Sequence, residues 1–271
     1  MSVHGTSRPV SVHDVRAFKD RGERFAVLTA YDYLTAQILD EAGVPVLLVG
    51  DSLGMVVLGY DSTVPVTVEE MLHHTRAVSR GAKRAMVVGD MPFGSYQASI
   101  EDGIRNAVRF LQEGAATAVK VEGAGPVVDL TSRLTHMGVP VMAHIGLTPQ
   151  SVNQLGGFKV QGRSDAAADR LVEDAVSLAQ AGAFAVVVEA VPADVGRRIT
   201  QAVDVPTIGI GAGPQTDGQV LVVSDMVGLT AGRLPRFVKP YADLRQVMTD
   251  AVKSFSAEVA SGDYPDPEHS Y

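Results

Sequence analysis

Short apolar runs recur along the chain and alternate with stretches that have the spacing of amphipathic helices. The runs are four to eight residues long, rich in Val, Ile and Ala, and bounded by Gly or Pro. A run of this kind is typical of a strand buried on both faces. We predict eight strands: Phe25–Tyr31, Pro45–Gly50, Ala85–Gly89, Ala118–Glu122, Pro140–Ile145, Phe184–Glu189, Pro206–Gly211 and Gln219–Val223.

Helix-patterned segments fill the intervals between these strands. Gly near the end of a helix supplies the left-handed C-cap, and a following Pro stops the helix. Strict alternation with short connections implies parallel strands and right-handed crossovers, so eight units predict an α/β fold, the (β/α)8 TIM barrel. The weakest link is 213–219, where almost no room remains for a helix. The clearest helical segments are Tyr33–Ala42, Val68–Arg80, Ile100–Glu113, Ala166–Ala181 and, after the last strand, Ala242–Ala260.

The barrel is expected to take up the whole chain as a single domain. No shift in composition marks a second domain within residues 1–271, and this length is usual for one barrel. Polar segments are expected at both ends, an arm over about 1–13 and a tail over about 261–271. The long glycine-containing loop Gly146–Ser164, after the fifth strand, is a candidate lid.

Composition excludes several kinds of site and partner. The chain has no cysteine, which excludes disulfides, thiolate zinc sites and a cysteine nucleophile. A formal net charge of −8, without a run of Lys or Arg, makes nucleic acid and anionic membranes poor partners. No apolar stretch has the length of a membrane span, and residues 1–10 lack the apolar core of a signal peptide. We therefore expect a cytoplasmic enzyme with small-molecule substrates.

Six of the eight predicted strands end on an acidic residue. In a barrel, the loops after the strands form one open mouth, and catalytic residues lie there. Asp51, Asp90 and Glu122 follow three adjacent strands, so they could converge on one small volume. Oxygen ligands alone favour a hard cation such as Mg²⁺ or Mn²⁺. The alternative is that each acid caps the following helix or pairs with a surface Arg.

Three further residues at strand ends are candidates for chemistry. Lys120 lies two residues before Glu122, so both point into the barrel. Lys120 could hold a substrate carboxylate, neutralise the acids around it or form a Schiff base. His144 could act in the pocket or be a satisfied polar residue. Glu189 ends the apolar run Ala-Val-Val-Val, where desolvation would suit it to act as a base, or it could cap a helix near Pro192.

Longer motifs in the same chain occur in a characteristic order. They are Leu28–Asp32, Leu48–Ser52, Gly59–Pro65, Asp90–Tyr96, Val119–Gly123, Val141–Ser151, Gly156–Gly162, Gly209–Gly213 and Asp217–Val222. Together they resemble the ketopantoate hydroxymethyltransferase (3-methyl-2-oxobutanoate hydroxymethyltransferase) family. The match runs from about Phe18 to the terminal Tyr271, nearly the whole chain. No single motif decides it, but many long ones in the right order do.

The resemblance implies a metal site with one Mg²⁺ per subunit. Asp51 and Asp90 match the family's magnesium ligands, through which the substrate is also bound. Glu122 matches a third acid that reaches the ion through water. The family commonly has Glu-Gly-Gly where this chain reads Glu122-Gly-Ala124, and its segment 53–58 is variable, but neither departure touches a matched ligand.

The resemblance also implies roles for the neighbouring residues. Ser52 and Lys120 match contacts to the bound oxo acid, and His144 matches a nearby pocket residue. Glu189 matches the proton acceptor. The folate contacts are less well marked by motif, and no residue is assigned to them. The family assembles as a homodecamer, so a homo-oligomer is expected here.

The implied activity is the transfer of a hydroxymethyl group from 5,10-methylenetetrahydrofolate to 3-methyl-2-oxobutanoate by Mg²⁺-assisted enolisation. The product is 2-dehydropantoate (ketopantoate), on the route to pantothenate and coenzyme A. A Mg²⁺-dependent carbon–carbon lyase or phosphoenolpyruvate mutase would share the fold, but the lyases of that group rely on a loop cysteine that this chain lacks. A non-catalytic scaffolding barrel would need no acids at its strand ends.

Overall fold

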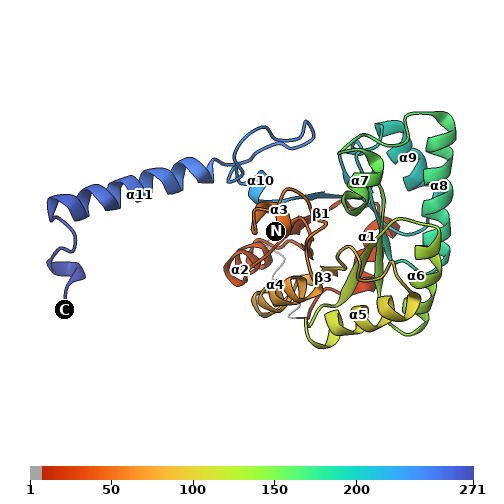
Figure 1. The fold of residues 1–271 in the computed structure, drawn as a ribbon, viewed down its shortest axis with the longest axis horizontal. Helices are drawn as coiled ribbons and strands as arrows, with labels where there is room; N and C mark the ends of the chain where they lie inside the picture. The colour runs from red at the N-terminus through yellow and green to blue at the C-terminus, as the bar shows by residue number, and fades with distance from the viewer. Residues whose placement is uncertain (1–7) are drawn as a thin grey trace. The chain divides into compact units, whose positions relative to one another are not determined.

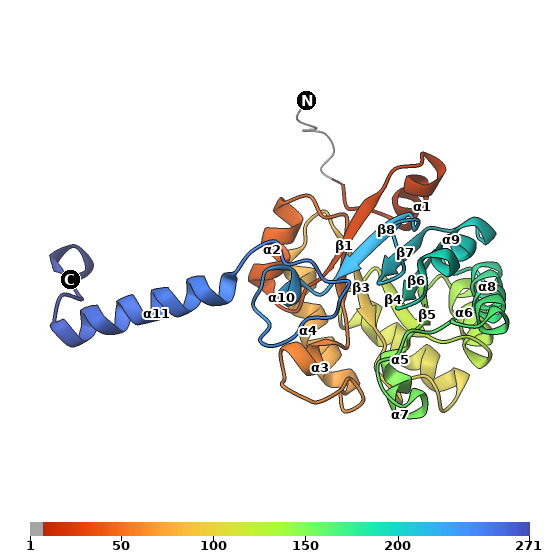
Figure 2. The same ribbon diagram turned by 90° about the horizontal axis from the view of Figure 1, so that it is seen from above.

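The computed structural model describes residues 8–271 and contains a closed barrel of eight parallel strands. The strands pair in chain order, and β1 pairs with β8 to close the ring. Figures 1 and 2 show these strands with helices arranged around them. The predicted (β/α)8 fold is confirmed. The strands are β1 (Phe25–Thr29), β2 (Val46–Val49), β3 (Met86–Asp90), β4 (Ala118–Glu122), β5 (Val141–Gly146), β6 (Ala185–Glu189), β7 (Thr207–Ile210) and β8 (Gly218–Leu221).

Most of the barrel's longer helices begin at a side chain that accepts a backbone N–H from the first turn. Ser11, Asp32, Thr67, Ser99 and Ser164 are such N-caps, which satisfy donors that a helix start leaves unpaired. Residues 211–217 form no helix, as the short link predicts. The helices of this unit are α1 (Val12–Asp20), α2 (Tyr33–Glu41), α3 (Leu53–Val56), α4 (Val68–Gly81), α5 (Ile100–Gln112), α6 (Pro126–His136), α7 (Val152–Leu155), α8 (Asp165–Gln180) and α9 (Ala193–Ala202), with the 3₁₀ turn η1 (Pro149–Ser151).

Five of the predicted strands begin one residue later than the apolar pattern suggests, and three of those five predictions open on a proline. Pro45, Pro140 and Pro206 open the predicted runs, but the strands start at the residue that follows each proline. Proline has no N–H to donate to a neighbouring strand, so it marks the entry to the strand and is not part of the ladder. The apolar pattern therefore located the strands, and backbone hydrogen bonding set their ends.

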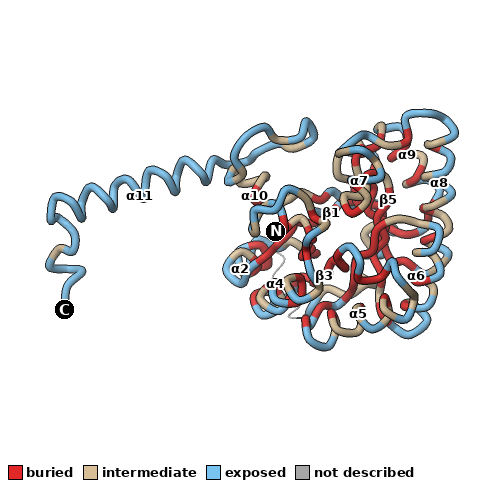
Figure 3. The backbone as a smooth tube through the Cα atoms, in the orientation of Figure 1, coloured by how far each residue is buried: buried red, intermediate tan, exposed pale blue. Residues whose placement is uncertain are grey.

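The chain divides into two compact units, Met1–Val222 and Val223–Tyr271. The second contains α10 (Val223–Met226), α11 (Leu244–Ser261) and the 3₁₀ turn η2 (Pro267–His269). The predicted helix 242–260 corresponds to α11, which has no buried residue and is exposed along its length in Figure 3. A single domain with an arm and a tail stays a prediction, and residues 1–7 of the arm lie outside the described residues. No helix within 8–271 is long and apolar enough to cross a membrane.

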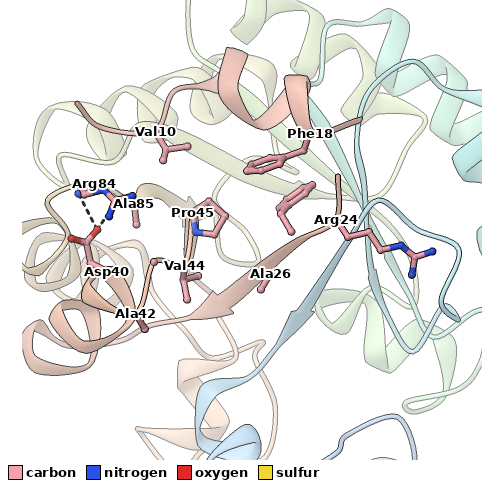
Figure 4. A pocket seen from close by; sticks show the side chains of 12 residues that line it. Val10, Phe18, Arg24, Ala26, Asp40, Ala42, Val44, Pro45, Arg84 and Ala85 are labelled. Atoms are coloured by element: carbon pink, nitrogen blue, oxygen red, sulfur yellow. Dashed lines mark hydrogen bonds between the residues drawn. The ribbon is translucent and has the colours of Figure 1, made fainter. Parts of the chain in front are cut away.

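The amino-terminal end of the barrel is apolar and is packed against α1. Val15 is fully buried in the same cluster as the strand residues, and the rings of Phe18 and Phe25 stack with centroids 4.8 Å apart. A pocket of about 450 Å³ opens at this end (Figure 4). Its carboxylate, Asp40, accepts the backbone N–H groups of Arg84 at 2.9 Å and Ala85 at 2.6 Å. Both hydrogen bonds are accepted by Oδ1, so the side chain of Asp40 fixes the backbone at the start of β3.

Close packing of β3 against α5 depends on a glycine. A Cβ built on Gly89 would lie 2.4 Å from Cδ1 of Phe110, and Phe110 is fully buried. No side chain fits there unless the aromatic ring moves. Gly89 also precedes Asp90, so the contact helps to set where β3 ends.

We predict that Gly89→Ala lowers the free energy of unfolding by about 1–3 kcal/mol, the usual range for overpacking a core. Urea denaturation followed by circular dichroism measures the loss. Phe110→Leu gives the added methyl group room, so the two substitutions together should cost less than the sum of their separate losses. Full additivity would show that Phe110 is not what requires the glycine.

Candidate functional site

The charged residues predicted at the strand ends lie together at the carboxyl end of the barrel. Neighbouring strands place them in register, since Asp90 of β3 is paired with Lys120 of β4, and Glu122 of β4 with His144 of β5. All four, together with Asp51 after β2, are at most 7% exposed. Burial of this many ionisable groups is costly unless they compensate one another or bind a ligand. The barrel therefore concentrates its buried charge at one end.

Asp51, Asp90 and Glu122 form a compact set of oxygen ligands. One carboxylate oxygen from each lies within 4.8 Å of the others. Asp90 accepts the backbone N–H of Asp51 through Oδ2 at 3.0 Å. Its other oxygen, Oδ1, is buried without a hydrogen-bond partner, although Lys120 Nζ lies 2.8 Å away. Three buried carboxylates whose oxygens lie this close repel one another, and a divalent cation would satisfy them together, so these residues fit one.

The electrostatics of the two aspartates agree with this fit. Burial, and then repulsion from Asp90 and Glu122, holds the pKa of Asp51 well above its usual range. Burial also raises the pKa of Asp90, even though Lys120 opposes the shift. The surrounding protein therefore does not fully compensate the negative charge that either acid has when ionised. A hard cation would supply the missing compensation.

Lys120 lies among the carboxylates as a buried cation. Its Nζ is 2.8 Å from Asp90 Oδ1 and 3.1 Å from Glu122 Oε1. Burial alone would lower its pKa, but Asp90, Glu122 and Asp51 outweigh burial and raise the pKa well above the usual value. The ammonium is therefore charged, whereas a Schiff base requires the neutral amine. This geometry favours the electrostatic interpretations of Lys120 over the Schiff base.

Asp90, Lys120, Glu122, His144 and Glu189 form a row of charged side chains along the strand ends. Glu122 and His144 continue this row toward β6. His144 Nδ1 lies 3.2 Å from Glu122 Oε1, and its Nε2 lies 3.2 Å from Glu189 Oε2 without forming a hydrogen bond. Burial and Lys120 act to lower the pKa of His144, but Glu122 and Glu189 outweigh them and raise it to about 9. For Glu122, burial is outweighed by Lys120 and His144, and its pKa falls to about 2. The imidazole is therefore a cation between two carboxylates.

Glu189 is the most accessible member of this row, with 16% of its side chain exposed. Position and accessibility suit a group that meets a substrate. Ser52 is half-buried at the start of α3, and its Oγ lies 2.9 Å from the hydroxyl of Tyr31. Two further strand-end acids are used elsewhere, because Asp32 caps α2 and Asp225 accepts the Thr230 hydroxyl at 2.6 Å. For those two acids the structural interpretation holds.

The sequence reasoning missed two polar residues at the mouth. The hydroxyl of Tyr96 accepts the backbone N–H of Glu122 at 2.9 Å, and Gln150 Nε2 donates to Asp51 Oδ2 at 2.9 Å. Tyr96 is 4% exposed and so is Gln150. Both lie in motifs that carried the family resemblance, but they stand on loops, where hydrophobic periodicity gives no signal. Gln150 belongs to the loop Gly146–Ser164, whose role as a lid stays a prediction.

Solved structures with a similar fold are distant in sequence. A putative phosphonomutase from Burkholderia cenocepacia superimposes with a TM-score of 0.61 at 16% identity, over 92% of this chain and 99% of the other. Phosphonopyruvate hydrolase, in a complex with oxalate and Mg²⁺, gives a TM-score of 0.60 at 13% identity, over 95% of this chain and 92% of the other. At these identities the similarity shows the barrel fold alone.

Similarity in sequence is much closer to one group of enzymes. A 3-methyl-2-oxobutanoate hydroxymethyltransferase of Syntrophus aciditrophicus is 56% identical over 271 residues, all of both chains. The enzyme of the same name from Thermobifida fusca is 58% identical over 265 residues, which is 98% of this chain and 94% of that one. A sequence model described as ketopantoate hydroxymethyltransferase matches residues 9–267. This chain belongs to the ketopantoate hydroxymethyltransferase family.

Proposed function

We propose that this chain transfers a hydroxymethyl group from 5,10-methylenetetrahydrofolate to 3-methyl-2-oxobutanoate and releases 2-dehydropantoate for pantothenate and coenzyme A synthesis. Family membership at 56% identity over the full length supports the reaction. The observation that carries the chemistry is the buried set Asp51, Asp90 and Glu122, which offers three carboxylate oxygens within 4.8 Å of one another. Three buried carboxylates at a barrel mouth, two of them undercompensated, are suited to a divalent cation, which would assist the enolisation of a 2-oxo acid.

We assign the metal site to the same three acids. Asp51 and Asp90 would hold Mg²⁺ directly, and Glu122 would hold it through water. When bound, the ion polarises the keto group of the oxo acid and stabilises negative charge on its oxygen. Lys120 fixes the Asp90 and Glu122 carboxylates from the interior side, at 2.8 and 3.1 Å. Ser52 and Lys120 are then available to contact the substrate carboxylate.

Glu189 is the base in this proposal. Its side chain is the most accessible carboxylate of the row, and it takes the proton from C3 of the oxo acid as the C–H electron pair forms the enolate. The folate opens to its iminium as the first carbon–nitrogen bond of its one-carbon unit breaks, and C3 bonds to that carbon. The second carbon–nitrogen bond then breaks, water supplies the hydroxyl oxygen, and the C3 proton and a water proton end on the two nitrogens of the released tetrahydrofolate. His144, 3.2 Å from Glu189, holds the carboxylate in place as a neighbouring cation and lines the pocket.

We also propose that the chain works in the cytoplasm as a homodecamer, as the family resemblance implies. Small-molecule substrates follow from the family, whereas this assembly and this compartment rest on the resemblance alone. Size-exclusion chromatography with light scattering measures the mass of the assembly directly, against 28.5 kDa for one chain.

Exchange of the C3 hydrogen of 3-methyl-2-oxobutanoate in D₂O tests the proposed chemistry. We expect exchange to require Mg²⁺, to stop with EDTA, and to fall by about 10²–10⁴-fold in Glu189→Gln, because general base catalysis contributes a factor of that size. Proton NMR follows the loss of the C3–H signal. Production of 2-dehydropantoate with 5,10-methylenetetrahydrofolate then establishes the transfer.

Glu173→Gln is the matched control, since Glu173 is exposed on α8. It should exchange and transfer at the wild-type rate. Metal-dependent exchange that persists in Glu189→Gln would remove Glu189 from the role of base. Wild-type protein that binds metal but neither exchanges nor transfers would contradict the proposed function.

The charge on His144 makes a prediction about pH in the metal-free protein. The pKa in the fold is about 9, above the ordinary value of about 6.5 in an unfolded chain. A raised pKa stabilises the fold below the unfolded value, and that stability is lost as pH rises from about 6.5 to about 9. Denaturation curves in EDTA should therefore show wild type losing up to a few kcal/mol over this range relative to His144→Gln. A pH-independent difference between the two proteins would contradict a charged His144.

A further inference from the structure

Gln150 is a buried amide that connects the loop after β5 to the acid cluster. It is the central residue of η1, and 4% of it is exposed. Its Nε2 donates to Asp51 Oδ2 at 2.9 Å and to the carbonyl oxygen of Met91 at 2.9 Å. Its backbone N–H donates to Glu122 Oε2 at 3.1 Å. One loop residue thus contacts two of the three acids.

The orientation of this amide is fixed by its partners. Oε1 accepts the Tyr96 hydroxyl at 2.8 Å and Gln97 Nε2 at 3.0 Å. Nε2 faces a carboxylate and a carbonyl, which only accept. Both amide hydrogens and both acceptor positions of Gln150 are therefore used, and exchanging the amide oxygen and nitrogen would turn Oε1 toward two acceptors and break the hydrogen bonds to Asp51 and Met91. The contacts with Tyr96, Gln97 and Met91 therefore fix the direction of the N–H that points at Asp51.

A fixed donor on Asp51 matters because this carboxylate lies beside other carboxylates. Asp51 Oδ2 is turned toward Gln150, whereas its neighbour Asp90 accepts the backbone N–H of Asp51 itself. Repulsion from the other acids would rotate the Asp51 carboxylate away from them. A hydrogen bond from an amide to one of its oxygens prevents this rotation and leaves the other oxygen directed toward a cation. Partners of this kind orient the residues that bind a metal.

We propose that Gln150 is a positioning residue that holds Asp51 and Glu122 for the divalent cation. When the cation is bound, Gln150 thereby fastens the loop Gly146–Ser164 to the metal site. The inference rests on the proposed function, because it concerns the same metal site. Gln150 touches the acids and not the reacting atoms, so its effect reaches catalysis through metal binding. The loop is fastened because the donor to Asp51 and the donor to Glu122 both belong to residue 150.

Binding of Mn²⁺ alone, measured by electron paramagnetic resonance of the free ion, tests the proposal without substrate. Gln150→Met keeps the length of the side chain and removes its amide donors to Asp51 and Met91, while the backbone N–H to Glu122 stays. We expect its Kd for Mn²⁺ to rise about 10–100-fold, as is usual when such a supporting hydrogen bond is lost. The matched control is Gln154→Met on α7, since Gln154 is exposed, and its Kd should not change.

Limited trypsin digestion supplies a second readout, the rate of cleavage in the loop. Weakening of a single metal ligand would not change that rate. Lys159 and Arg163 are exposed on the loop and offer two cleavage sites. Mn²⁺ should slow cleavage there in wild type and in Gln154→Met, but not in Gln150→Met at a Mn²⁺ concentration that saturates the variant. Unchanged Mn²⁺ affinity in a folded Gln150→Met protein, or undiminished protection of the loop, would overturn the proposal.

The design separates this proposal from the proposed function. Wild-type protein that binds Mn²⁺ but does not transfer the hydroxymethyl group would contradict the function and leave the Gln150 measurement valid. Wild type without Mn²⁺ binding would overturn the positioning role. If Gln150→Met fails to fold, Gln150→Asn takes its place, because the shorter amide cannot reach Asp51 and adds no bulk. Wild-type Mn²⁺ affinity in Gln150→Asn would equally overturn the positioning role.

Discussion

Burial of charge at one end of the barrel is the constraint on which the rest of the site depends. Water cannot solvate these groups, so each must be compensated by a neighbour. Along the strand ends the signs alternate, from Asp90 to Lys120 to Glu122 to His144 to Glu189, with contacts of 2.8 to 3.2 Å. Asp51 lies outside this alternation and has no cation of its own. The row therefore has one carboxylate more than its two cations balance, and Asp51 adds a second uncompensated negative charge.

This deficiency of positive charge explains why protons and a metal ion compete for the same acids. Four carboxylates and two cations leave two negative charges, which either protons on Asp51 and Asp90 or one divalent ion can neutralise. The raised pKa values of both aspartates express the first state. Binding of an ion replaces the protons, so affinity for the metal must rise with pH until these acids are ionised. The same residues thus set both the charge and the pH dependence of the site.

The sequence predicted the framework because parallel strands buried on both faces leave a strong local signal. All eight strands, the missing helix at 211–217 and the cluster of acids were found in this way. The apolar pattern could not distinguish Asp32, which caps α2, from Asp51, since both follow a strand directly. Capping depends on local backbone geometry that residue type alone does not specify.

Loop residues were harder to predict for a related reason. Tyr96 and Gln150 are polar residues without periodicity, and they become site residues only because the chain folds back on the mouth. Gly146 makes this possible after β5, where φ is +92° and an added Cβ would lie 2.2 Å from the carbonyl oxygen of Glu189. No property of residues 96 and 150 considered alone indicates that contact.

Strand-borne and loop-borne groups therefore make different contributions to the site. The ladder of β3 and β4 fixes Asp90, Lys120 and Glu122, whose spacing cannot change without breaking strand pairing. Asp51 stands two residues beyond the end of β2, and its side chain is held by an amide from a loop that lies 99 residues further along the chain. Rigid elements give a site its precision, and the segments that must move to admit a substrate are less stable. The position of Asp51 thus links the rigid strand ends to the loop after β5, whose role as a lid is predicted.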